Sequence, residues 1–94
     1  MAEMRRINVI VTGLVQGVGY RYYTLVQAQQ LGLSGWVRNL PDGRVEVVAQ
    51  GNSVALVQLL EALKSGPNRA TVEGAVVDWL EPEQLPVDKF SVRY

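Results

Sequence analysis

The spacing of the apolar residues switches repeatedly along this chain, and the order of the switches restricts the folds that it can adopt. Alternation of apolar and polar residues predicts a strand, and recurrence every three or four residues predicts a helix. The predicted strands are Ile7–Thr12, Trp36–Leu40, Arg44–Gln50, Val72–Leu80 and a short one at Phe90–Tyr94. The predicted helices are Tyr20–Leu31, ended by Gly32, and a second that Gly51-Asn52-Ser53 begins and Ser65-Gly66-Pro67 stops.

This order is strand-helix-strand-strand-helix-strand with a short C-terminal strand, and it predicts an α+β fold, the ferredoxin-like α/β sandwich. One antiparallel sheet would be covered by two helices, and residues 1–94 would form a single domain. Pro41-Asp42-Gly43 predicts a hairpin turn, and Glu81–Pro86 a polar connection. The third strand and the second helix are expected to bury Val45, Val47, Ala49, Leu56, Leu59, Leu60 and Leu63.

The residue types that are missing restrict the chemistry. The chain has no cysteine and no histidine, so it lacks the usual zinc ligands and the usual base and thiol nucleophile. We therefore expect no metal and no cofactor. The formal net charge is zero, which argues against a general nucleic-acid binder. No apolar run has the length of a membrane helix, so we expect a cytoplasmic protein, and for so small and neutral a chain a monomer.

The segment between the first predicted strand and the first predicted helix could bind an anion. Glycines at 17 and 19 allow tight turns that aim several N–H groups at one point. The helix that follows begins with unpaired N–H groups and partial positive charge, and Arg21 lies in its first turn. The spacing matches neither a Walker A loop nor the G-x-G-x-x-G pattern. A tight turn with a surface arginine is the more frequent explanation of so short a motif, so the residues alone favour that interpretation over an anion site.

Two separate motifs resemble the signatures of the acylphosphatase family. The first is Gly13-Leu14-Val15-Gln16-Gly17-Val18-Gly19-Tyr20-Arg21, and the second runs from Leu31 to Asn39 and continues through Asp42-Gly43 and Val45-Glu46-Val47 to Gly51. The likeness covers essentially the whole chain, and its one mild departure is Tyr20, where phenylalanine is more usual. The resemblance implies an enzyme that hydrolyses the carboxyl–phosphate bond of small-molecule acyl phosphates. Its products would be a carboxylate and inorganic phosphate, which would also compete with the substrate.

The resemblance also implies which residues form the site. Arg21 would bind the phosphate of the substrate, and Asn39 would position the attacking water. Backbone amides would wrap the phosphate oxygens, and those assigned to this role belong to Val15, Gln16, Gly17, Val18, Gly19 and Tyr20.

Hydrolysis of an acyl phosphate needs little catalytic equipment. The leaving group is a carboxylate with a pKa of about 4, which departs without protonation. The transition state at phosphorus is loose, so positioning and electrostatics dominate catalysis. Because the Asn39 amide is not a base, we hypothesise that the proton of water passes to a phosphate oxygen of the substrate, with no covalent intermediate. Asp42 is the nearest acidic residue, and we expect it to bond its own backbone in the turn instead.

Three other functions are compatible with the predicted fold, but the residues of this chain argue against each of them. An RNA-recognition domain needs exposed aromatic residues on its central strands, and the predicted central strands Ile7–Thr12 and Arg44–Gln50 have none. A metallochaperone needs cysteine. A non-catalytic carrier or regulatory part of a larger maturation enzyme would retain the anion site, but the chain ends soon after the predicted fold closes, which favours a free-standing enzyme.

Overall fold

A computed structural model describes residues 3–84 and 89–94. Its seven elements follow the predicted order, and the predicted strand and helix bounds hold to within a few residues. In chain order they are β1 (Met4–Leu14), α1 (Tyr20–Gln30), β2 (Ser34–Asn39), β3 (Val45–Asn52), α2 (Ser53–Ser65), β4 (Thr71–Leu80) and β5 (Phe90–Arg93). The polar connection predicted at Glu81–Pro86 is described only as far as Gln84, and Leu85 and Pro86 lie outside the described residues.

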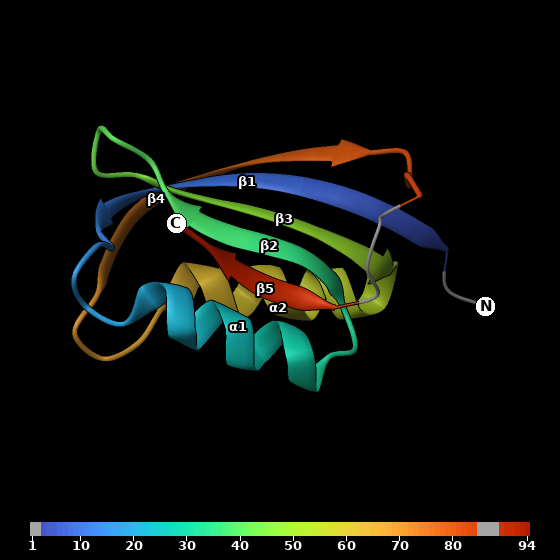
Figure 1. Ribbon diagram of the computed structural model, residues 1–94, viewed down its shortest axis with the longest axis horizontal. Coiled ribbons are helices and arrows are strands. Elements are labelled where there is room, and N and C mark those ends of the chain that lie inside the picture. The colour runs from blue at the N-terminus through green and yellow to red at the C-terminus, as the bar shows by residue number, and fades with distance from the viewer. Residues whose placement is uncertain (1–2, 85–88) are drawn as a thin grey trace.

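The strands form one five-stranded sheet in the order β4-β1-β3-β2-β5 (Figure 1). β1 pairs antiparallel with β3 and β4, and β2 pairs antiparallel with β3. β5 pairs parallel with β2, so the prediction of an entirely antiparallel sheet is wrong at this edge. The reason lies in where β4 ends: Leu80 is opposite Arg6, at the end of the sheet where β2 begins. A strand that starts from that end runs in the direction of β2.

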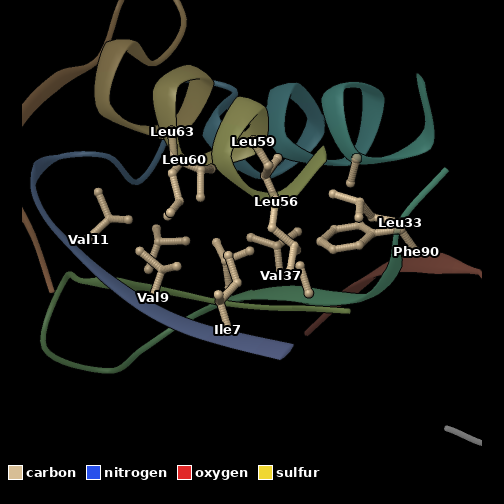
Figure 2. Packing of buried hydrophobic residues seen from close by; sticks show 14 of the residues in the cluster. Ile7, Val9, Val11, Leu33, Val37, Leu56, Leu59, Leu60, Leu63 and Phe90 are labelled. Carbon is tan, nitrogen blue, oxygen red and sulfur yellow. The ribbon is translucent and has the colours of Figure 1, made fainter. Parts of the chain in front are cut away.

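Both helices lie on the same face of the sheet, as the sandwich predicts (Figure 1). Between the two layers the valines and isoleucine of the strands meet a leucine stripe on α2 (Figure 2). The expected core positions on β3 and α2 are confirmed, because every one of them is buried. The first residue of α1, Tyr20, belongs to this core, so the core holds the start of that helix.

The start of α1 is fixed by a buried tyrosine. Tyr20 is 1% exposed, and its hydroxyl donates a 2.7 Å hydrogen bond to the Leu63 carbonyl in the last turn of α2. Burial raises the pKa of this hydroxyl far above its ordinary value, so it stays protonated and able to donate. The hydroxyl that distinguishes Tyr20 from the more usual phenylalanine therefore satisfies a C-terminal carbonyl of one helix from the first residue of the other.

The opposite face of the sheet carries aromatic residues packed against arginines. Because β5 lies outside β2, β2 is an internal strand, and its Trp36 is on this open face. The guanidinium carbons of Arg6 and Arg93 lie 5.6 and 3.9 Å from the centre of the Trp36 ring. The indole is thus engaged by the protein's own cations, which does not favour the stacking of a nucleic-acid base.

Candidate functional site

The loop after β1, the end of β2 and the C-terminus lie at the same end of the sheet (Figure 1). A cavity of about 540 Å³ is lined by residues of this loop, of α1, of the end of β2 and of the C-terminal segment. Six of the eight predicted site residues line it: Val15, Gly17, Gly19, Tyr20, Arg21 and Asn39. Two separate motifs, about twenty residues apart in the sequence, therefore reach the same space.

The backbone N–H groups of the loop after β1 make no hydrogen bonds with the described residues. Within the described residues, no N–H group of residues 15–20 donates to a carbonyl or a side chain, and the first helical donor after them is Tyr23, which bonds the Gly19 carbonyl at 3.0 Å. Gly17 and Gly19 have φ of 73° and 81°, in the left-handed region that residues with a Cβ rarely adopt. A loop followed by a helix N-terminus with free donors is a typical anion-binding arrangement.

Arg21 has no carboxylate partner among the described residues. Arg6, Arg38 and Arg44 each pair with an acidic side chain, at 3.0, 2.7 and 2.7 Å. Arg5, Arg69 and Arg93 are also without such a pair in this part of the chain, but of these unpaired arginines Arg21 is the one in the cavity lining. Arg21 is half-buried in the cavity wall, and its guanidinium carbon lies 4.9 Å from the centre of the Tyr94 ring. Its charge is therefore available to an anion in the cavity.

Asn39 is the last residue of β2 and faces the same cavity. Its Oδ1 atom is the buried side-chain acceptor without a hydrogen-bond partner in the described part of the chain. An unsatisfied buried polar atom destabilises a fold by about 1–3 kcal/mol, so its retention needs an explanation. A side-chain amide that can hydrogen-bond a ligand or water in the cavity provides one.

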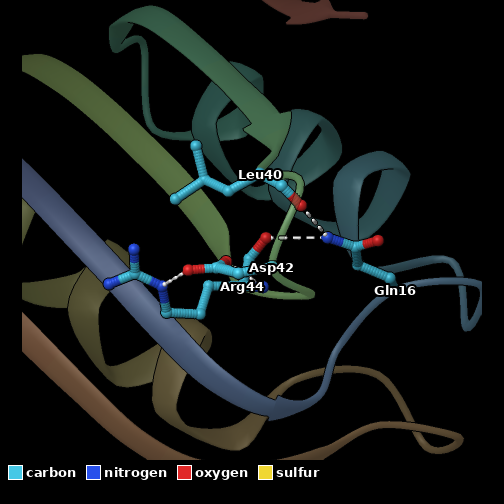
Figure 3. A network of polar contacts seen from close by, with 4 residues as sticks. All are labelled: Gln16, Leu40, Asp42 and Arg44. Atoms are coloured by element: carbon cyan, nitrogen blue, oxygen red, sulfur yellow. Dashed lines mark hydrogen bonds and ion pairs between the residues drawn. The ribbon is translucent and has the colours of Figure 1, made fainter.

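Two predicted loop residues are outside the cavity wall. Val18 packs against the hydrophobic core. Gln16 points toward the β2–β3 hairpin, where its Nε2 donates to the carbonyls of Leu40 and Arg44 at 2.8 and 2.9 Å (Figure 3). The loop thus alternates between residues that line the cavity and residues that anchor it, and the Gln16 side chain ties the loop to the residue that follows Asn39.

Asp42 behaves as the turn residue that the sequence predicts. Its carboxylate accepts from the Arg44 backbone N–H at 3.1 Å and pairs with the Arg44 Nε at 2.7 Å (Figure 3). The backbone hydrogen bond, and then the guanidinium, lower the pKa of this exposed carboxyl. Asp42 is not part of the cavity wall, so the expectation that it serves the turn is confirmed.

Seven residues of the cavity wall are not among the predicted site residues: Tyr22, Leu25, Gln29, Phe90, Ser91, Val92 and Tyr94. A sequence signal exists for Leu25 and Gln29, because they follow Arg21 by four and eight residues and so share its face of the helix. Nothing local marks the β5 residues, since their place depends on the direction of that strand.

The described residues contain no group of three or more carboxylate, histidine or cysteine side chains that could hold a metal ion. No helix in residues 3–84 and 89–94 is both long enough and apolar enough to cross a membrane.

Comparison with known proteins gives a consistent result. The family model described as Acylphosphatase matches residues 7–92. The chain is 54% identical to an acylphosphatase of Thermus thermophilus over 87% of this chain and 93% of that protein. It is 46% identical to one of Archaeoglobus fulgidus over 97% of this chain and 100% of that protein. The crystal structure of the Bacillus subtilis acylphosphatase has a TM-score of 0.90 at 37% identity, covering 98% of this chain and all of that one.

Gln16→Glu tests whether the hydrogen bonds to the hairpin hold the loop in place. The substitution removes the amide that donates both hydrogen bonds. At neutral pH the new carboxylate has no proton to donate to the Leu40 and Arg44 carbonyls. We expect the free energy of unfolding, measured with urea, to fall by about 1–3 kcal/mol. These carbonyls favour the protonated form of the new carboxyl in the folded state, so its pKa is raised there. The loss should therefore shrink as the pH falls through that raised pKa, and be smallest below the ordinary glutamate pKa of about 4.3, where the protonated group can donate.

Gln30→Glu is the matched control, because Gln30 is exposed at the end of α1. It makes the same chemical change and should alter stability far less. Equal losses in the two variants would contradict a role of Gln16 in holding the loop.

Proposed function

The chain belongs to the acylphosphatase family, hydrolases that act on acyl phosphates, and on that premise we propose that the cavity beside residues 15–21 is its active site. In this proposal the phosphate of the substrate lies against the free N–H groups of the loop and the Arg21 guanidinium, and Asn39 orients the attacking water. The observation that carries the proposal is that these groups have no internal hydrogen-bond or ion-pair partner among the described residues and belong to one cavity, whose described lining contains no acidic side chain.

The electrostatics favour a phosphate dianion there. The loop amides and the N-terminal end of the α1 dipole supply partial positive charge, and no acidic side chain occupies the first turn of the helix. Arg21 adds a full charge and a planar pair of donors that fits two phosphate oxygens. Because the donors are held by the backbone, they need little reorganisation as charge spreads over the equatorial oxygens in the transition state.

The reaction needs one attack and one departure. Water, held by the Asn39 amide, forms a bond to phosphorus while the bond from phosphorus to the acyl oxygen breaks. The carboxylate leaves with that electron pair, and the proton of water passes to a phosphate oxygen of the substrate. Inorganic phosphate and a carboxylate are the products, with no metal ion, cofactor or covalent intermediate in the sequence of steps.

We further propose that the protein works as a cytoplasmic monomer on a small molecule, with neither nucleic acid nor membrane as a partner. One chain closes its own two-layer core around buried strand and helix residues. A composition without cysteine suits a reducing compartment, and zero net charge gives no overall attraction to polyanions.

Hydrolysis of benzoyl phosphate in the presence of excess chelator tests two proposals together: that the protein has acylphosphatase activity, and that this activity needs no metal ion. We expect turnover by the wild type and competitive inhibition by inorganic phosphate. Arg21→Gln should lose about 2–4 kcal/mol of transition-state stabilisation, roughly 30- to 1,000-fold in kcat/KM, and should also lose phosphate inhibition. Arg38→Gln is the matched control, since Arg38 pairs with Glu46 outside the cavity.

Binding of phosphate without turnover by the wild type would instead support a non-catalytic regulatory module. Activity that disappears with chelator would contradict the metal-free mechanism.

Asn39→Ala separates water positioning from phosphate binding. We expect the inhibition constant of phosphate to stay within about twofold, while kcat falls by roughly 100-fold or more because the water loses its orienting acceptor. Steady-state kinetics with benzoyl phosphate, with phosphate as competitor, measures both quantities. An unchanged kcat would remove Asn39 from the mechanism.

A further inference from the structure

We propose that the acyl group of the substrate lies in the groove between α1 and β5, and that this groove selects apolar acyl groups of medium length. The inference rests on the proposed function, because it assumes that the phosphate lies at Arg21. The cavity that holds the predicted phosphate site does not end there: it continues along the helix and the C-terminal strand, so a substrate anchored at one end would extend into the rest.

The helix forms one wall of the groove. Arg21, Leu25 and Gln29 line it at intervals of four residues, which places them in one row along α1. Eight residues of helix rise about 12 Å, so the row extends about that far from the guanidinium. The row changes along its length from a cation, through an aliphatic side chain, to an uncharged amide.

The last strand forms the other wall. Phe90, Ser91, Val92 and Tyr94 line the same cavity. Phe90 and Val92 share one side of β5, and Tyr94 follows the end of the strand at the same spacing. Val92 is opposite Val37, two residues before Asn39, so the strand runs toward the proposed phosphate site and Phe90 is at the far end. Four residues of strand span about 13 Å, which matches the length of the helical wall.

The chemistry of the two walls is mainly apolar. Between the charged end at Arg21 and the amide of Gln29, the side chains are aliphatic or aromatic apart from Ser91, and no residue of the lining within 3–84 and 89–94 is acidic. A second cavity of about 200 Å³ shares Gln29 and Phe90 with the first and adds Gly32, Leu33 and Lys89, so the groove continues past the amide toward a cation. These walls fit the methylenes of an unbranched acyl chain, whereas an acetyl group would leave most of them uncovered.

Chain length should therefore control the specificity constant. Burying a methylene completely is worth about a fourfold gain in affinity, and a groove open on one side should give about twofold. Six added methylenes, from acetyl to octanoyl phosphate, would then raise kcat/KM by roughly 30- to 100-fold. The leaving groups in this series are aliphatic carboxylates of similar basicity, so their intrinsic reactivity is matched.

The experiment measures kcat/KM for acetyl, butyryl, hexanoyl and octanoyl phosphate with the wild type and two matched variants. Gln29→Glu puts a carboxylate at the far end of the groove and should lower the octanoyl-to-acetyl ratio about fivefold or more. Gln30→Glu makes the same change at the neighbouring position, outside the lining, and should leave that ratio within about twofold. Both positions are exposed, so neither substitution disturbs the core.

Leu25→Ala adds a test of the apolar wall, with circular dichroism as a check that it folds. We expect its octanoyl-to-acetyl ratio to fall, because the chain loses its aliphatic contact. Equal kcat/KM across the four substrates, or equal effects of the Glu substitutions at 29 and 30, would overturn the acyl groove while leaving the acylphosphatase activity in place. No turnover of any of the four would overturn the proposed function as well.

Discussion

The free N–H groups at the start of α1 are the constraint around which the rest of this structure is arranged. Each is a hydrogen-bond donor without a partner in the part of the chain that the structure describes, and donors of this kind bond to water or to a ligand. Here the carboxylate that often accepts from a helix N-terminus is missing, and an arginine occupies the first turn in its place. The local charge is therefore positive in a chain whose net charge is zero. This end of the helix favours the binding of an anion.

Two side chains keep the donors in position from either side of the loop. Tyr20 fixes the start of the helix through its buried bond to the Leu63 carbonyl, and Gln16 fixes the loop through two carbonyls of the hairpin. The contact with the hairpin holds both the loop and the end of β2, because Leu40 directly follows Asn39. The phosphate-binding loop and the water-positioning residue of the proposed site thus share one support. Preorganised donors of this kind stabilise a transition state without moving, which suits a reaction that needs no general acid.

Much of the architecture could be predicted from the sequence because it depends on local periodicity. The alternation on β3 and the leucine stripe on α2 specify which faces are buried, and Gly32 has the left-handed φ of 70° that the expected end of α1 requires. The direction of β5 could not be predicted, since it depends on which end of the sheet the chain leaves after β4. The partners of Gln16 were also hidden, because backbone carbonyls 24 and 28 residues away carry no sequence signal. The same holds for the groove, whose second wall exists only because β5 lies beside β2.

The most direct test of the central claim is a titration of the ¹⁵N-labelled protein with inorganic phosphate, followed by the chemical shifts of its backbone amides. If the free donors of the loop and helix start form the anion site, the largest shift changes will belong to the amides of residues 15–20 and will saturate with the same dissociation constant as the Arg21 side chain. Saturating changes centred instead on the arginines of the open sheet face, with residues 15–20 unaffected, would contradict the account.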